Sequence, residues 1–186
     1  MTVFDEIRLI VFIAATVAII YVSRRTILSF RSHGFYRFLA WEAITALIFW
    51  NLPYWFTWPL SAMQLVSWIV LIASLFVLWQ GLSLLRRVKR SGRRRDKELY
   101  DFERTSELVT SGIYRYIRHP LYASLLYLAI GACLKDISWI SLILLILAVI
   151  ALYATARADE KECIEFFGQE YKAYMEGTKR FIPYIF

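Results

Sequence analysis

The sequence predicts an all-α integral membrane protein with five transmembrane helices, the N-terminus outside and the C-terminus in the cytosol. Of its 186 residues, 59% are hydrophobic, and the mean hydropathy of +0.50 is high for a soluble domain. Five apolar stretches come close to the roughly 20 residues that a helix needs to cross a bilayer. Lys and Arg concentrate in alternate connecting segments, and this asymmetry sets the orientation.

The expected spans are residues 3–22, 38–58, 60–85, 121–134 and 137–156. The third and fifth carry no charge at all. A soluble helical bundle is therefore a poor explanation, because such helices have no polar face to present to water. Asp5 and Glu6 precede the first stretch where a signal peptide has positive charge, so we expect a retained span.

The orientation follows from the positive charges. Of the 22 Lys and Arg residues, 20 fall in segments 24–37, 86–118 and 157–180, which leaves Arg8 and Lys135 on the other side. Positive loops stay in the cytoplasm, and we expect the plasma membrane of a prokaryote. The net charge of +7 does not indicate nucleic-acid binding, because a basic run beside a membrane span attracts anionic lipid headgroups. Cys133 and Cys163 fall on opposite sides and should not pair.

We expect one membrane domain, with three N-terminal spans in residues 1–85 and the functional part in residues 86–186. Unusual polar residues gather first at residues 107–122, where Thr110-Ser111-Gly112 is typical of a turn. Pro120 suits the first turn of a helix, which puts His119 at the cytosolic mouth of the fourth span. A helix N-terminus there favours a carboxylate or phosphate. Arg115 and Tyr116 are at least as consistent with a simple interfacial anchor.

The tail after Arg157 is the second polar region, and its pattern predicts a cytosolic amphipathic helix that ends at Gly177. Glu160 leads the apolar face of this helix, so its carboxylate requires a cationic partner, either a nearby arginine or a cationic ligand. The short turn at Lys135-Asp136 predicts an antiparallel pair of helices. This pair brings the His119 and Glu160 regions to one end of the molecule.

Glu42 lies inside the second span. An ionisable residue at such a place is a functional candidate by default, although a helix-holding role is favoured here. The fourth span, at 14 residues or about 21 Å, is short for a bilayer core of roughly 30 Å. The residues around His119 are therefore expected at the cytosolic boundary of the membrane.

Two runs of the sequence carry a family resemblance. The first is Leu108-Val109-Thr110-Ser111-Gly112-Ile113-Tyr114 with Arg118-His119-Pro120-Leu121-Tyr122, and the second is Asp159-Glu160, Phe166-Phe167-Gly168, Tyr171, Tyr174 and Phe181-Ile182-Pro183. Together they resemble the signature of isoprenylcysteine carboxyl methyltransferases and related membrane phospholipid methyltransferases. The resemblance covers roughly residues 108–184, and the first three spans match no motif.

The resemblance implies S-adenosylmethionine as cofactor, no metal, and a lipophilic acceptor that is a prenylcysteine-type carboxylate or a lipid headgroup. It implies catalytic roles for His119, Arg157 and Glu160. The implied cofactor contacts are Leu108, Val109, Tyr114, His119, Pro120, Leu121, Tyr122, Asp159 and Glu160. Two departures are that Ala123-Ser124 stands where many relatives have glycine, and that the first acidic position is Asp159 instead of Glu.

The acceptor stays open at this point. A carboxylate is already ionised near neutral pH and needs no general base, whereas an amine would need one, for which His119 is the candidate. Two other classes are weighed. A nicotinamide-dependent sterol reductase has a related tail but a longer chain, and a scaffold or transporter does not explain polar residues gathered at one hairpin mouth.

Overall fold

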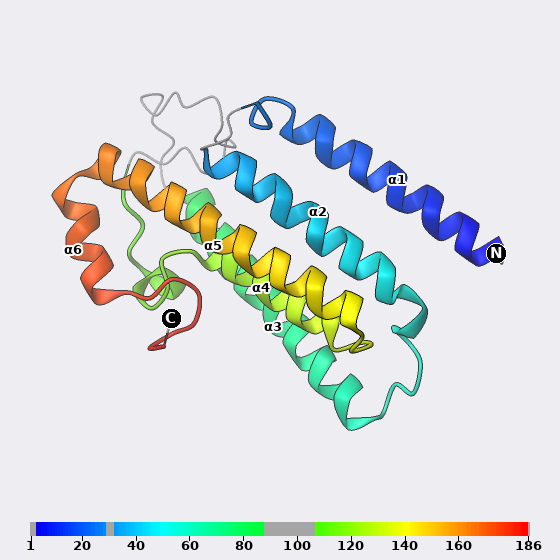
Figure 1. Ribbon diagram of the computed structural model, residues 1–186. Helices are drawn as coiled ribbons and strands as arrows, with labels where there is room; N and C mark the ends of the chain where they lie inside the picture. Colours follow the sequence, from blue (N-terminus) through cyan, green and yellow to red (C-terminus); the bar gives the residue numbers. More distant parts are fainter. Residues whose placement is uncertain (1–2, 29–31, 88–106, 186) are drawn as a thin grey trace.

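The computed structural model describes residues 3–28, 32–87 and 107–185, and these residues form helices and no strand (Figure 1). The all-α fold is therefore confirmed for this part of the chain. The α-helices are α1 (Val3–Ser23), α2 (His33–Asn51), α3 (Ala62–Arg87), α4 (Pro120–Cys133), α5 (Trp139–Phe167) and α6 (Gln169–Gly177). Short 3-10 turns lie at Leu52–Tyr54 and Gly112–Arg115.

The first five helices coincide with the five expected apolar stretches, with shifted ends. α2 begins before its apolar part, at His33, because the Ser32 side chain accepts a hydrogen bond from the N–H of Phe35 and caps the helix. It ends at Asn51, where the chain enters the 3-10 turn that contains Pro53. Proline cannot donate the backbone hydrogen bond that would continue the helix.

The tail departs from its prediction. A separate helix starting near Arg157 is wrong, because α5 runs without interruption from Trp139 to Phe167. The break comes at Gly168, whose φ of +62° and ψ of −129° lie in a region that glycine alone adopts readily. The amphipathic α6 follows and ends at Gly177, as expected.

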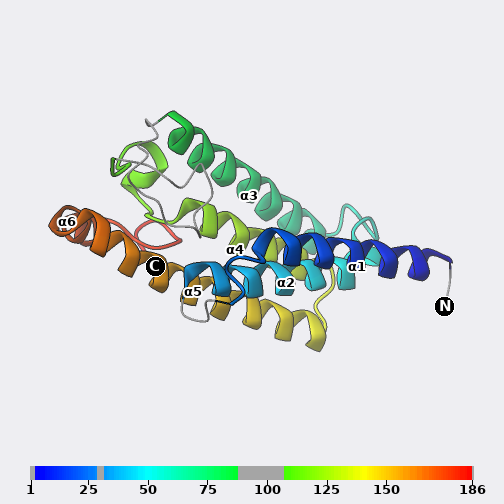
Figure 2. The same ribbon diagram turned by 90° about the horizontal axis from the view of Figure 1, so that it is seen from above.

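The helices alternate in direction and pack around α4 and α5 (Figures 1 and 2). α2 packs on α5 and α4, α3 packs on α4, and α1 lies at the edge against α2. Small residues let α3 approach α4 closely: a Cβ on Gly131 would lie 2.7 Å from the Leu71 side chain. The Ser67 hydroxyl donates to the Gly131 carbonyl at 2.7 Å. Small residues and interhelical serine bonds are typical of helix packing in membranes.

α3 and α5 are long and apolar enough to cross a membrane, while α4 is a shorter apolar helix. Only 22% of the most apolar window of α3 and 33% of that of α5 are buried inside the protein. A core helix of a soluble protein would be mostly buried, so these faces are suited to lipid. Both helices are therefore suited to span a membrane. The number of spans and their orientation stay predictions.

The alternating directions give the bundle two distinct ends. At the end that we call the site end, the His33 ring contacts Glu162 and the Arg118 side chain contacts Glu160. At the opposite end, the buried Lys135 ammonium donates to the Gln64 side chain at 3.0 Å. Residues 88–106, which hold most of the expected basic loop, lie outside the described residues, as does Arg31.

Inside the second span, the Glu42 carboxylate accepts a hydrogen bond from the Thr16 hydroxyl of α1 at 3.0 Å. The contact ties α1 to α2. It agrees with the helix-holding role favoured for Glu42 from the sequence.

Candidate functional site

The segment before α4 is held by the C-terminal strap, which we define as residues 178–185. The N–H of Arg118 donates to the Lys179 carbonyl at 2.8 Å, and the N–H of His119 donates to the Arg180 carbonyl at 3.2 Å. In return, the N–H of Lys179 donates to the carbonyl of Tyr116 at 3.1 Å. These bonds fix His119 at the first turn of α4, where Pro120 occupies the opening position.

Glu160 lies behind this segment, and arginine side chains donate hydrogen bonds to both of its carboxylate oxygens. Its Oε1 accepts from Arg118 Nε at 2.7 Å and from Arg180 Nε at 2.9 Å, and its Oε2 accepts from Arg180 Nη2 at 3.0 Å. Glu160 is only 4% exposed. Of the two partners expected for this carboxylate, an arginine or a cationic ligand, the structure therefore provides arginines. Arg157 is exposed and donates to the Tyr153 hydroxyl at 3.4 Å.

Asp159, one position earlier, points to a different environment. Its Oδ2 lies 3.5 Å from Nδ1 of His119, and its Oδ1 accepts from the Cys163 thiol at 3.7 Å. Its side chain keeps 19% of its surface exposed, against 5% for Glu160. These two neighbours on α5 thus have different surroundings: the Glu160 carboxylate is bonded to the arginines that hold the strap, and the Asp159 carboxylate faces the pocket described below.

His119 is buried between both carboxylates and stacks on Tyr122, with ring centroids 5.4 Å apart. Its Nε2 lies 3.5 Å from Oε1 of Glu160 but is a buried atom without a hydrogen-bond partner. Burial by itself would lower the pKa of His119, but the carboxylates of Asp159 and Glu160 outweigh burial and raise it. The imidazole is therefore held in its protonated form over a wider pH range than usual.

These elements enclose a pocket of about 680 Å³, a volume that includes its open mouth. Every cofactor contact implied by the resemblance lines it except Glu160, which lies behind the wall, and Arg157 is not part of the lining either. The lining residues are Leu85, Leu108, Val109, Tyr114, Arg118, His119, Pro120, Leu121, Tyr122, Asp159, Cys163, Phe167, Tyr171 and Tyr174. The lining residues that were not predicted as contacts are Leu85, Arg118, Cys163, Phe167, Tyr171 and Tyr174. Of these, Cys163 and Phe167 follow Asp159 at helical intervals of four residues.

Aromatic rings from α5 and α6 form one wall of this pocket. Phe167 stacks on Tyr171 with centroids 6.5 Å apart, and Tyr171 meets Tyr174 edge-on at 5.8 Å. The Tyr174 hydroxyl donates to the Tyr114 carbonyl at 2.6 Å, which ties α6 to the segment before α4. Burial raises the pKa of both Tyr171 and Tyr174, so their hydroxyls stay neutral.

A second, larger hollow opens beside the first. This apolar groove has a volume of about 1190 Å³ including its open side. It runs along α4 between α2 and α3, which both pack on α4. Leu121 and Tyr122 line the pocket and the groove alike, so the two adjoin. The groove is lined mainly by leucine and tryptophan, with the arginines Arg37 and Arg86 among its lining residues.

A pocket that holds charged and aromatic side chains and adjoins an apolar groove agrees with the comparison to known families. The profile of the family described as phospholipid methyltransferase matches residues 68–170, more than half of the chain. The chain belongs to this family. The matched region covers most of α3 and all of α4 and α5, and so includes both Asp159 and His119.

Curated relatives are similar over a shorter stretch. The protein-S-isoprenylcysteine O-methyltransferase of Saccharomyces cerevisiae is 35% identical over 79 residues, which is 42% of this chain and 33% of the relative. The enzyme of the same name from Homo sapiens is 35% identical over 83 residues, 44% of this chain and 29% of the relative. The matched region thus spans about a third of the length of these relatives.

Proposed function

We propose that this protein is an S-adenosylmethionine-dependent methyltransferase that modifies a lipophilic acceptor at the site end of the bundle, facing the cytosol. The observation that carries the proposal is the junction at Leu121 and Tyr122. There a pocket with a carboxylate and aromatic rings adjoins an apolar groove. A donor that is polar and charged and an acceptor with an apolar tail would meet at this junction. Membership of the phospholipid methyltransferase family supports the reaction type.

The chemistry of the pocket fits the cofactor. Asp159 offers a carboxylate for an ammonium group, and it is the better exposed of the two neighbouring acids. Arg118 and the N-terminal turn of α4 suit a carboxylate. The rings of Tyr114 and Tyr122 can face a sulfonium, an interaction of up to about 2 kcal/mol when water is excluded. Nε2 of His119 is buried and makes no hydrogen bond, although it lies 3.5 Å from Oε1 of Glu160.

When bound, the cofactor would supply an electrophilic methyl group. The residues of this chain then have to position the acceptor against the methyl group and to exclude water from the space between them. Holding two reacting groups in line removes much of the entropic barrier to a displacement. The aromatic wall of Phe167, Tyr171 and Tyr174 excludes water from this position. Glu160 contributes indirectly, because its bonds to Arg118 and Arg180 hold the strap and the segment before α4 together.

A carboxylate acceptor fits the site better than an amine. An amine must lose a proton, and the only histidine in the pocket, among the described residues, is His119. The neighbouring carboxylates raise the pKa of His119 and so favour its protonated form, in which an imidazole cannot accept a proton. A carboxylate needs no base because it is already ionised. The name of the curated relatives, O-methyltransferases of isoprenylcysteine, points the same way.

The cofactor assignment is tested by titrating purified protein in detergent with S-adenosylhomocysteine. A bound ligand at a hundredfold excess over its dissociation constant should stabilise the protein by about 2.7 kcal/mol. NADPH serves as the control for the reductase alternative and should give no stabilisation. A rise in melting temperature with NADPH alone would overturn the assignment in favour of a reductase.

The acceptor is tested with labelled S-adenosylmethionine. Farnesylcysteine carrying a free carboxylate should be methylated, whereas its methyl ester should not. Phosphatidylethanolamine in mixed micelles tests the amine alternative. Transfer to the amine and none to the carboxylate would contradict the role given to His119.

A further inference from the structure

The lining of the apolar groove carries positive charge at one end only. Arg37 of α2 and Arg86 of α3 line it at the site end, and the remaining lining from α3 and α4 is mainly leucine. The two serines in this lining are already bonded: the Ser74 hydroxyl donates to the Ser124 carbonyl at 2.8 Å, and the Ser124 hydroxyl donates to the Leu121 carbonyl at 2.7 Å. A positive mouth that leads into an apolar groove suits an amphiphile with an acidic head and a hydrocarbon tail.

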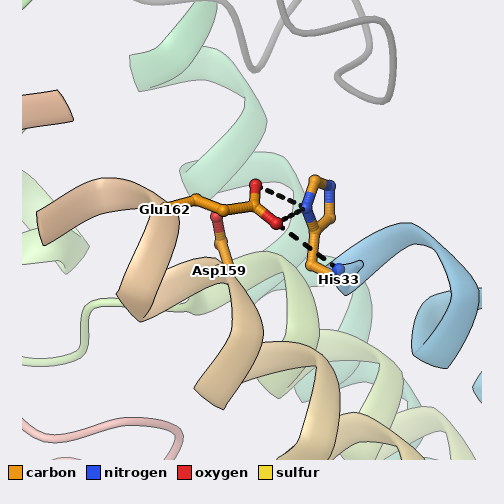
Figure 3. A group of neighbouring side chains, drawn as sticks. All are labelled: His33, Asp159 and Glu162. Carbon is orange, nitrogen blue, oxygen red and sulfur yellow. Dashed lines mark hydrogen bonds and ion pairs between the residues drawn. The ribbon is translucent and has the colours of Figure 1, made fainter. Parts of the chain in front are cut away.

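The start of α2 fixes the position of this mouth. His33 lies one helical turn before Arg37, and its Nδ1 is 2.8 Å from Oε1 and 2.7 Å from Oε2 of Glu162 on α5. Figure 3 shows this pair, with Asp159 beside Glu162 on the same helix. Such distances are those of a charge-assisted hydrogen bond. The helix that carries Asp159 therefore also holds the end of α2 that brings Arg37 to the groove.

The length of the groove can be measured along α3. A Cβ on Gly81 would lie 3.2 Å from Pro120 and 3.3 Å from Leu121, so Gly81 marks the level at which the groove meets the cofactor pocket. The lining residue of α3 farthest from this level is Trp68, thirteen residues earlier in the helix. At the rise of an α-helix, this separation corresponds to about 20 Å.

Two tryptophan rings stand at the far end of the groove and are held by a buried lysine. Trp55 and Trp68 meet edge-on, with ring centroids 6.0 Å apart. The Lys135 ammonium lies 3.5 Å from the centroid of the Trp68 ring and donates to Oε1 of Gln64 at 3.0 Å. Nε2 of Gln64 in turn donates to the carbonyls of Tyr54 and Lys135, at 3.2 and 3.1 Å. These contacts fix Trp68 in place.

Behind the rings lies a separate hollow, which we call the end pocket. It has a volume of about 700 Å³ including its open side, and its lining includes Gln64 and Lys135. The groove and the end pocket share no lining residue. Trp55 and Trp68 thus face the groove, while their polar neighbours face the end pocket, and a chain that lies in the groove stops at the rings.

The distance from the junction to Trp68 sets the length of tail that the groove can hold. An isoprene unit adds about 5 Å to an extended chain, because its four carbon–carbon bonds of about 1.5 Å alternate in direction. We propose that the acceptor carries a single isoprenoid tail of about four units, and that Trp55 and Trp68 select this length. The inference rests on the proposed function, in which the tail of the acceptor occupies the groove.

The test is a titration without cofactor, so that binding is measured apart from methyl transfer. The probes are N-acetyl-S-prenylcysteines with two, three, four and five isoprene units, added to purified protein in detergent and followed by calorimetry. Affinity should be highest for four units and about tenfold weaker for five, because the fifth unit meets the tryptophan rings. Equal or rising affinity from four to five units, or no binding of any probe, would overturn the proposal.

Trp68→Ala opens the end of the groove, and the five-unit probe should then bind about tenfold more tightly than it binds to the unchanged protein. The matched control is Trp79→Ala, which removes an exposed tryptophan of α3 that does not line the groove and should leave the order of the four probes unchanged. Because the micelles are the same for all proteins, a change in this order cannot come from partition of the probes into detergent. The same gain in both variants would overturn the proposal.

Leu75→Trp tests the opposite change and does not disturb the contacts of Lys135. Leu75 lines the groove six residues from Gly81, about 9 Å along α3, and is 66% exposed, so a larger side chain can be accommodated. The four-unit probe should bind at least about tenfold more weakly, while the two-unit probe should stay within about threefold. An equal loss for both probes would contradict selection by length.

The proposed function can fail separately from this inference. If the probes bind in the expected order but labelled S-adenosylmethionine transfers no methyl group to them, the methyltransferase assignment is wrong and the selection of tail length stands. If methyl transfer occurs at the same rate for all four tail lengths, the selection of length is wrong and the assignment stands.

Discussion

Replacing Asp159 and Glu160 one at a time should separate cofactor binding from folding. Asp159→Asn and Glu160→Gln each keep the shape of the side chain and remove one negative charge. The two residues are adjacent on α5, yet Asp159 lines the pocket and Glu160 is bonded to Arg118 and Arg180. We expect Asp159→Asn to weaken binding in a stable protein and Glu160→Gln to destabilise the protein.

The magnitudes follow from burial and bonding. Removing one partner of a buried ion pair costs about 3–5 kcal/mol of folding free energy, because the remaining charge is left uncompensated. Glu160 is 4% exposed and serves two arginines, so Glu160→Gln belongs in this range. Asp159→Asn removes a charge-assisted bond to the ligand, and about 1.5–3 kcal/mol of binding free energy should be lost. This corresponds to roughly a ten- to hundredfold rise in the dissociation constant.

The two effects are measured separately on the same samples. Thermal unfolding in detergent without ligand gives stability, and calorimetric titration with S-adenosylhomocysteine at a temperature where each variant is folded gives affinity. The reasoning is refuted if Glu160→Gln loses binding at full stability while Asp159→Asn binds normally. That outcome would assign the ammonium group to Glu160.

Three further results are expected. Gly168→Ala should lower stability by roughly 1–3 kcal/mol, because the positive φ at this position is strained for alanine. It should also weaken S-adenosylhomocysteine binding, because the strain displaces α6. The control is Gly177→Ala, which has open space around it and should change neither stability nor binding. His119 has a raised pKa, so the stability that its protonation contributes is complete below its ordinary pKa of 6.5 and is lost as pH rises through the raised value. The melting temperature of the His119→Asn variant should therefore decrease less at alkaline pH than that of the unchanged protein. An equal decrease in both proteins would contradict the direction given for the pKa of His119. Thr16→Val should lower stability by about 1 kcal/mol through loss of its bond to Glu42, with ligand affinity unaltered in the same titration.

The distribution of apolar and charged residues was sufficient to predict the helices. Uncharged runs of 20 residues or more have few stable conformations other than a lipid-facing or deeply buried helix, which is why α3 and α5 were expected from the sequence. Most residues named from the sequence as cofactor contacts line one pocket, because His119 and Pro120 mark the opening of α4 and the α4–α5 hairpin brings this opening to the acidic end of α5. Both predictions depend either on local sequence patterns or on the short connection between α4 and α5.

Which carboxylate faces the pocket was decided only by the tertiary structure. Asp159 and Glu160 are adjacent, and helical periodicity favoured Glu160 because it leads the apolar stripe. That stripe does predict burial, but burial of an acid is compatible with a ligand or with arginines. The arginines Arg118 and Arg180 come from segments 42 and 20 residues away along the chain. No local pattern reports contacts at such a separation.

The partner of His33 could not be predicted from the sequence either. Nothing in the residues around it distinguishes a histidine that only opens a helix from one that is paired with a distant carboxylate. Its partner Glu162 is 129 residues distant in sequence. The sequence by itself determined which segments become helices, because hydropathy and charge act on each segment separately. The packing of α2 against α5 set the partner of His33, and the packing of the segment before α4 and of the strap against α5 set the partners of Asp159 and Glu160. Charges interact through space, and their energy depends on distances that only the folded chain sets.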